Sequence, residues 1–147
     1  MKYSLELDIN LPRGVLVELF DNMDNLKHWQ PDLVSWEYLD DHPGEPGSQA
    51  KLVYKMGKGE IEMIETIVKR SLPDEFSATY EAKGVWNSVE NYFIEVDSTT
   101  TTWVFGTEFK FTGIVMRLFA ILLPGAFKKK SFQYMLQFKE FAESQIA

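Results

Sequence analysis

The chain opens on a regular alternation of apolar and polar residues. Every second residue from Tyr3 to Ile9 is apolar, which predicts a strand over residues 2–10 with one buried face. Pro12 then stands where a helix can begin, and apolar residues recur at helical spacing from 15 to 20. A second short helix is expected to end before Pro31, because the residue that precedes a proline avoids helical backbone angles.

Beyond residue 32 the apolar period changes to two, which is the period of a strand. Clusters of Gly, Pro and Asp separate the apolar rows and predict turns between them. Six strands are expected, over residues 34–38, 50–56, 61–68, 76–82, 85–97 and 103–111. Their short and regular spacing indicates an antiparallel meander. The order of elements predicts one α+β domain that spans residues 1–147.

The C-terminal region begins with an apolar segment, Ile114–Leu123, whose only charged residue is Arg117. This segment is too short to span a bilayer, which needs about 20 apolar residues. The Pro-Gly pair at 124–125 then interrupts the pattern, and a proline inside a helix breaks or kinks it. We therefore expect two helices with a bend between them, over residues 114–122 and 127–144.

The first of these two helices is apolar on all sides, and three interpretations of it stay open. Its surroundings could be a second copy of the chain, a membrane surface or the tail of a bound ligand. Three lysines follow at residues 128–130. They are typical of a solvated face, and the alternative is that they attract anionic lipid headgroups in a peripheral membrane contact.

Composition narrows the possible functions. The 147 residues carry a formal net charge of -7, and such an acidic chain argues against a nucleic-acid partner. There is no cysteine, which excludes disulfides and thiolate chemistry. There are two histidines and no converging set of ligands in the pattern, so we expect no metal and no cofactor. The first residues lack the apolar run of a signal peptide, and we expect a cytoplasmic protein.

Several short motifs, spread over nearly the whole chain, resemble those of one superfamily. They are the opening strand that runs into Pro12, the segment Lys27–Pro31, the Pro46-Gly47 pair, the Thr102-Trp103 pair and the closing Phe138–Glu143. On these residues the chain resembles the START-related, polyketide-cyclase-like superfamily (SRPBCC), whose fold is the helix-grip of the major birch-pollen allergen. The resemblance implies a curved antiparallel sheet that wraps around a long C-terminal helix. It also implies a cavity between them for sterols, lipids, polyketides or other apolar molecules.

Candidate site residues follow from the strand faces and the helix stripes. The residues expected to line the cavity are Trp36, Tyr54, Met63, Tyr80, Asn87, Asn91, Trp103, Phe105, Met116, Phe119, Ala120, Leu123, Tyr134, Met135 and Phe138. No residue is assigned as catalytic. Glu65 and Glu108 are the candidates if their side chains point inward, because burial would raise the pKa of either carboxyl.

Three functions are compatible with this picture. The first is a non-enzymatic carrier or sensor that binds a small hydrophobic ligand of lipid, polyketide or aromatic type. The second is a cyclase or hydratase that uses buried polar residues of the cavity. The third is an interaction module that docks a partner, or its own copy in a homodimer, through helix 114–123. We favour the first of them.

Overall fold

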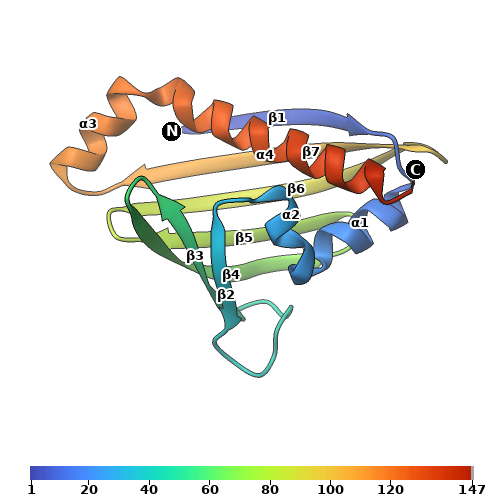
Figure 1. Cartoon of the computed structure of the whole chain (residues 1–147), viewed down its shortest axis with the longest axis horizontal. Helices are drawn as coiled ribbons and strands as arrows, with labels where there is room; N and C mark the ends of the chain where they lie inside the picture. The colour runs from blue at the N-terminus through green and yellow to red at the C-terminus, as the bar shows by residue number, and fades with distance from the viewer. Residues whose placement is uncertain (147) are drawn as a thin grey trace.

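The computed structural model describes residues 1–146, with the side chains of Val115, Phe119, Leu122 and Pro124 left out. Across these residues the chain forms seven strands and four α-helices (Figure 1). The elements are, in order, β1 (Lys2–Ile9), α1 (Arg13–Asp21), a 3₁₀ turn (Met23–Asn25), α2 (Leu26–Trp29), β2 (Leu33–Tyr38), β3 (Gln49–Met56), β4 (Gly59–Ser71), β5 (Glu75–Ala82), β6 (Val85–Asp97), β7 (Thr100–Phe111), α3 (Ile114–Leu122) and α4 (Pro124–Ser144).

All the strands of the described chain belong to one antiparallel sheet with the order β1-β7-β6-β5-β4-β3-β2. Strands β2 to β7 follow one another as a meander, and β1 pairs with β7 and forms the edge opposite β2. Figure 1 shows α4 running along the face of the sheet near β1 and β7, with α1 and α2 gathered at one end. One face of the sheet is therefore covered by helices, as the α+β prediction requires.

Two hairpin turns depend on glycine. Gly57 and Gly84 have φ values of 59° and 82°, in the left-handed region that other residues rarely adopt. Gly57 lies in the two-residue turn between β3 and β4, and Gly84 lies in the corresponding turn between β5 and β6. Because a short turn fixes the register of its two strands, these glycines help to decide which side chains share the inner face.

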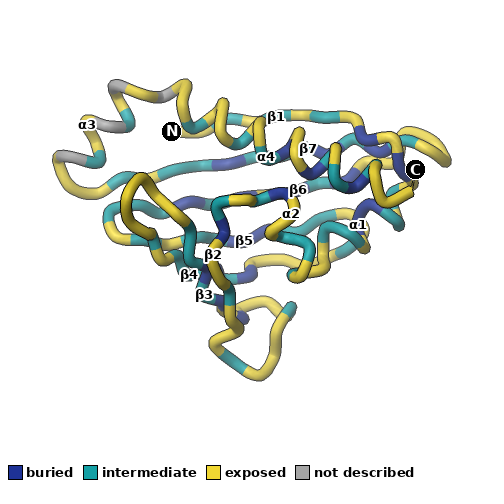
Figure 2. Tube along the Cα trace, in the orientation of Figure 1, coloured by how far each residue is buried: buried dark blue, intermediate teal, exposed yellow. Residues whose placement is uncertain are grey.

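The hydrophobic core occupies one end of the space between the sheet and the helices. Its fully buried side chains include Phe93, Trp103, Met135 and Phe138, with exposed fractions of 1%, 1%, 1% and 0%. Phe20 of α1 joins this cluster and lies within ring-contact distance of Phe93, Trp103 and Phe138. Figure 2 shows buried segments where the end of β1, α1 and the second half of α4 meet. This cluster fixes α4 to the sheet at its C-terminal half.

The predicted order of elements and the α+β helix-grip architecture are confirmed. The break in the C-terminal region is also present, because α3 ends at Leu122 and α4 follows it. Here the prediction differs in one respect: α4 begins at Pro124 and not at residue 127. A proline in the first helical turn needs no hydrogen-bonded N–H and has a suitable φ angle, so it starts a helix there. None of the described helices combines the length and the apolar character that crossing a bilayer requires.

Candidate ligand-binding site

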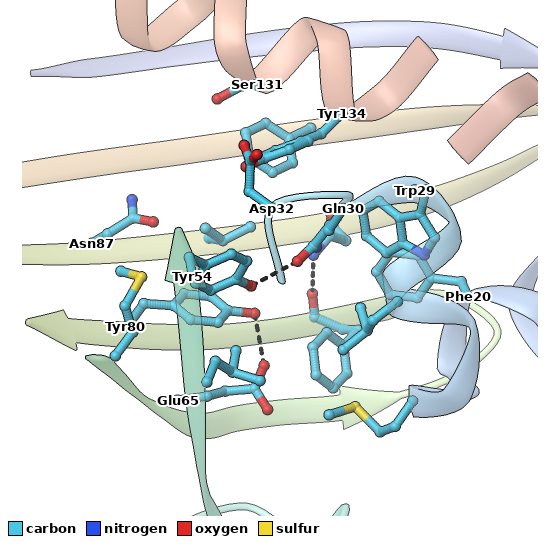
Figure 3. Close-up of a pocket in the computed structure, with 18 of the residues that line it drawn as sticks. Phe20, Trp29, Gln30, Asp32, Tyr54, Glu65, Tyr80, Asn87, Ser131 and Tyr134 are labelled. Carbon is cyan, nitrogen blue, oxygen red and sulfur yellow. Dashed lines mark hydrogen bonds between the residues drawn. The ribbon is translucent and has the colours of Figure 1, made fainter. Parts of the chain in front are cut away.

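A cavity of about 420 Å³ lies between the inner face of the sheet and the first half of α4. Strands β3 to β7 supply the floor, and α1, α2 and α4 supply the rest of the wall (Figure 3). Most of its lining is apolar or aromatic. The members of that kind include Phe20, Leu26, Trp29, Leu52, Ile61, Met63, Ile67, Phe76, Val89, Trp103, Phe105, Phe109, Phe127 and Met135. A pocket of this size and character is typical of sites that take small apolar molecules.

The first half of α4 contacts the sheet along β1 and β7, where Ser131 forms a hydrogen bond of 2.7 Å with Tyr3 and Phe127 packs on Phe109 and Phe111, and the volume beside these contacts stays open. The buried positions of α4 are Met135, Phe138 and Ala142, all in its second half. In the first half, Phe127, Ser131 and Tyr134 are only partly buried, and all three line the cavity. No fully buried side chain of α4 precedes Met135, so the described side chains leave an open volume beside the first half of the helix.

A row of polar side chains crosses the floor of the cavity. Glu65 on β4, Tyr80 on β5 and Asn87 on β6 are direct neighbours in the strand register. The Tyr80 hydroxyl donates a hydrogen bond of 2.8 Å to Oε2 of Glu65 (Figure 3). The three residues line the cavity, and Glu65 and Asn87 are 9% and 8% exposed. We refer to Glu65, Tyr80 and Asn87 as the polar row.

Two acceptor atoms of the polar row are free. Glu65 uses one carboxylate oxygen for Tyr80, and within the described chain its other oxygen has no hydrogen-bond partner. Asn87 donates from Nδ2 to Oγ1 of Thr107 at 2.7 Å and to the carbonyl oxygen of Glu108 at 3.1 Å, which leaves its Oδ1 without a described partner. A ligand with a hydroxyl or amine donor could therefore be held at either atom.

Burial changes the acid–base character of the polar row. Removal from water raises the pKa of the Glu65 carboxyl, and the hydrogen bond from Tyr80 only partly opposes this effect. The pKa of Tyr80 lies well above its ordinary value for the same reason, with the nearby Glu65 charge adding to the shift. Compared with an exposed glutamate, Glu65 is thus more often protonated, and Tyr80 stays a hydrogen-bond donor.

Replacing Glu65 by glutamine is expected to raise the melting temperature at about pH 7. The carboxyl has a folded-state pKa above its ordinary value of 4.5, so its contribution to stability is full at low pH and is lost as the pH rises through the raised pKa. Glutamine removes this loss and still offers an oxygen to Tyr80. The gain over wild type should shrink as the pH falls to about 4. Glu60→Gln, at an exposed site of the same strand, is the control. An equal gain at both pH values would contradict the assignment.

Asn91 has a different role from Asn87. Its Nδ2 donates to the carbonyl oxygen of Phe76 at 3.2 Å, and its Oδ1 accepts from Nε1 of Trp103 at 2.9 Å. Both ends of the amide are therefore bound to the protein. Asn91 satisfies the buried indole and fixes two floor strands together, and it offers less to a ligand than Asn87 does.

Polar pairs border the cavity. The Tyr54 hydroxyl donates to Oε1 of Gln30 at 2.6 Å, which ties β3 to the end of α2. Lys130 on α4 lies 2.9 Å from the Asp32 carboxylate, and both side chains are about half exposed. Arg70 pairs with Asp21 at the end of α1, and these two residues also line the cavity. The borders are polar and reach solvent while the interior is apolar, which favours a ligand with an apolar body.

The structure brings nine of the predicted lining residues together at this cavity. They are Tyr54, Met63, Tyr80, Asn87, Asn91, Trp103, Phe105, Tyr134 and Met135. Glu65, a predicted acid–base candidate, lies among them. Their presence at the wall is a geometric result, and their contact with a ligand remains a prediction.

The other candidates lie elsewhere. Trp36 packs on the ring of Tyr38 at 5.2 Å, and Phe138 is fully enclosed in the core. Met116, Ala120 and Leu123 belong to the α3 region, which projects beyond the sheet, and none of these three described residues lines the cavity (Figure 1). The side chain of Phe119 lies outside the described residues.

Glu108 does not point into the cavity, so the structure corrects its selection as an acid–base candidate. It is half exposed on the outer face of β7 and lies 3.9 Å from Lys110. Its neighbours Thr107 and Phe109 point inward, and side chains alternate along a strand, so Glu108 must point outward. The apolar row from Trp103 to Phe111 has the opposite parity to Glu108, so the alternation already indicated the outer face.

Several lining residues were not predicted. Leu52, Ile61, Ile67, Val89 and Phe109 could have been found, because each shares the inner face of its strand with a predicted residue at a spacing of two. Gln30, Asp32 and Ser131 come from helices and from the connection after α2, where no strand alternation marks the direction of a side chain. Among the described residues, no group of three or more histidine and carboxylate side chains is placed to hold a metal ion.

Comparison with known proteins supports the fold strongly. No protein-family model and no curated protein sequence matches the chain. Among solved structures, it is similar to the Zhui aromatase/cyclase from Streptomyces sp. R1128, with a TM-score of 0.85, 12% identity and coverage of 100% of this chain and 96% of the other. It is also similar to a START superfamily protein from Mycobacterium smegmatis, with a TM-score of 0.78, 10% identity and 99% of each chain covered.

A third similar structure is norcoclaurine synthase from Thalictrum flavum in complex with dopamine and hydroxybenzaldehyde. Its TM-score is 0.70 at 12% identity, and the match covers 98% of this chain and 87% of the other. The chain therefore has the helix-grip fold of START-related, polyketide-cyclase-like proteins, as its resemblance predicted. Because one fold can host several activities, the function has to be argued from the site.

Proposed function

We propose that this protein binds a small ligand with an apolar, aromatic-type body and at least one hydrogen-bond donor. The observation that carries the proposal is the cavity of about 420 Å³, whose apolar wall surrounds the polar row of Glu65, Tyr80 and Asn87. Apolar surface supplies most of the affinity of such sites, and a few fixed polar groups orient the ligand. The similar structures include an aromatase/cyclase and a synthase in complex with aromatic compounds. They support the proposal that this cavity binds an aromatic ligand.

The aromatic side chains of the cavity wall favour an aromatic ligand. Phe20, Trp29, Phe76, Phe105 and Phe109 line the cavity with ring faces and edges. Aromatic groups favour offset or edge-to-face contacts with other rings and gain about 0.5–1.5 kcal/mol per pair beyond simple burial. A flat ligand can make several such contacts at once.

The unpaired acceptor atoms of the polar row indicate where the polar group of the ligand binds. The second Glu65 oxygen and Oδ1 of Asn87 lack described partners, and both residues are largely buried. Neither atom is fully enclosed: among the enclosed side-chain nitrogen and oxygen atoms of the described residues, Nε1 of Trp29 alone lacks a partner, and Trp29 also lines the cavity. A ligand hydroxyl or amine can donate to either of the accessible acceptor atoms of the polar row, which favours this row as the place where the ligand's donor binds.

The experiment is a titration with a neutral aromatic probe, N-phenyl-1-naphthylamine, whose fluorescence rises in an apolar site. We expect the fluorescence to rise on mixing and to saturate at one probe per chain. The absence of a rise would contradict the proposal. A rise that increases without saturation would also contradict it, because that behaviour indicates adsorption to the surface and not a defined cavity.

A second candidate function is a cyclase or dehydratase activity, and the Glu65–Tyr80 pair favours it. A buried carboxyl with a raised pKa that accepts a hydrogen bond from Tyr80 can serve as an acid or base toward a bound substrate. The two candidates separate on Glu65→Gln, which should retain probe binding in both cases. Loss of turnover of a poly-β-ketone substrate in this variant would support an enzyme, and failure of the wild type to turn over any such substrate would support a binding protein.

A further inference from the structure

One face of α3 is apolar and open to solvent. Ile114, Leu118 and Ile121, spaced four and three residues apart, lie on this face with exposed fractions of 79%, 52% and 73%. Arg117 lies beside them on the same turn of the helix and is also exposed. Figure 1 shows α3 projecting beyond the edge of the sheet, so the other helices do not cover it. We refer to Ile114, Arg117, Leu118 and Ile121 as the α3 face.

The charge around the α3 face is opposite to that of the chain as a whole. The segment from Phe109 to Lys139 contains six of the 15 Lys and Arg residues and none of the 22 Asp and Glu residues. Within the described residues, Arg117, Lys128 and Lys129 form no ion pair, whereas the other three cations, Lys110, Lys130 and Lys139, are paired with carboxylates. In a chain with a net charge of -7, Arg117 on α3 and Lys128 and Lys129 near the start of α4 are thus described cations without an ion pair, close in sequence to the exposed apolar residues of α3.

We propose that the α3 face docks on the surface of an anionic lipid bilayer. A bilayer interface offers an apolar layer and negative headgroups in one plane, which matches a helix with exposed isoleucines and leucine beside lysines and an arginine. Cations near an anionic leaflet are attracted to it, whereas the acidic remainder of the chain is repelled. This opposition orients the molecule with α3 toward the membrane.

The attachment of α3 to the sheet suits such a role. Met116, on the side of α3 away from the α3 face, packs against the turn at Gly84, where a Cβ atom would lie 3.0 Å from Cγ of Met116. The helix is thus held by its inner side while its outer side stays free. Phe127 and Lys130, early in α4, line the cavity, so the docked helix would lie next to one end of it. The docking itself does not depend on the proposed ligand.

The experiment is co-sedimentation with vesicles of phosphatidylcholine mixed with phosphatidylglycerol, and with vesicles of phosphatidylcholine alone. We expect binding to the mixed vesicles that weakens with added salt, because exposed charges are screened. Ile114→Ser combined with Ile121→Ser should reduce the partition coefficient by about tenfold or more. Lys128→Gln combined with Lys129→Gln should reduce it on mixed vesicles by about fivefold or more.

Two matched controls separate the α3 face from general surface effects. Ile94→Ser combined with Val96→Ser removes two apolar residues that are 52% and 58% exposed on β6. Lys27→Gln combined with Lys69→Gln removes two exposed charges elsewhere. Both controls should bind mixed vesicles as the wild type does. Equal loss in the controls would overturn the proposal, and so would a wild-type protein that binds both kinds of vesicle equally or not at all. A dimer that the isoleucine variant dissociates, without vesicle binding by the wild type, would assign this face to a second copy and also overturn it.

Discussion

Replacing Phe138 by alanine is expected to lower the free energy of unfolding by about 3–5 kcal/mol. Phe138 is fully buried, and the rings of Phe20, Trp29 and Trp103 surround it with centroid distances of 5.8, 5.2 and 5.4 Å. Alanine would leave a cavity among rings that are held by the sheet and by α1 and cannot close around it. The loss of these contacts also removes the main attachment of α4 to the sheet.

Chemical denaturation measured by tryptophan fluorescence gives this free energy directly. The matched control is Phe132→Ala, the same substitution on the same helix at a side chain that is 36% exposed. It should cost less than about 1 kcal/mol, as substitutions near the surface usually do. Similar losses in the two variants would mean that α4 is not held by its buried side, and the described grip of the helix would be incorrect.

Replacing Val89 by tryptophan is expected to weaken binding of N-phenyl-1-naphthylamine by about tenfold or more, which corresponds to about 1.4 kcal/mol or more. Val89 lies on β6 between Asn87 and Asn91 and points into the cavity. An indole at this site would occupy the volume that the probe needs and would cover the polar row. Because the new side chain enters open space, the variant should fold with a modest change in stability, less than the roughly 1–3 kcal/mol of an overpacked core.

Val96→Trp is the control for this effect, because it introduces the same side chain on the same strand at a residue that is 58% exposed. It should bind the probe as the wild type does. If Val89→Trp also retains full affinity while its thermal unfolding stays cooperative, the probe binds somewhere other than the cavity.

The strands and their order could be predicted because alternation is a local property of the chain. The apolar rows that begin at Ala50, Phe76 and Trp103 each became one strand with the expected inner face. The cavity itself could not be derived in this way, since an empty volume depends on how far α4 stands from the sheet. The cavity is enclosed by side chains of α4 together with side chains of several strands, and the sequence does not show how these elements meet.

The polar row illustrates the same limit. Glu65 lies in a strand whose two faces are mixed, so the pattern left its direction open, whereas Glu108 alternates with the apolar row from Trp103 to Phe111 and could have been placed on the outer face. The register shows that Glu65 lies beside Tyr80 on the inner face, and Glu108 lies on the outer face near Lys110. Pairing between strands is a long-range property, and it decides which carboxyl is buried and therefore which pKa is raised.

The sequence pattern places the start of α4 at residue 127, three residues after its observed start at Pro124. A Pro-Gly pair can end a helix or stand at the start of the next one, and the pattern favoured the apolar repeat beyond Phe127 as the start. The structure uses Pro124 in the first turn of α4, so the second helix follows α3 almost at once. Only Leu123 separates α3 from α4, and Figure 1 shows α3 projecting beyond the sheet.

Native mass spectrometry of the purified protein tests the central claim most directly. We expect two peaks, one for the free chain and one for the chain with one small apolar molecule bound. The bound peak should be depleted in Val89→Trp and preserved in Val96→Trp. A wild-type protein that carries no guest, and that still fails to take up N-phenyl-1-naphthylamine when it is supplied in excess, would contradict the claim that this cavity is a binding site.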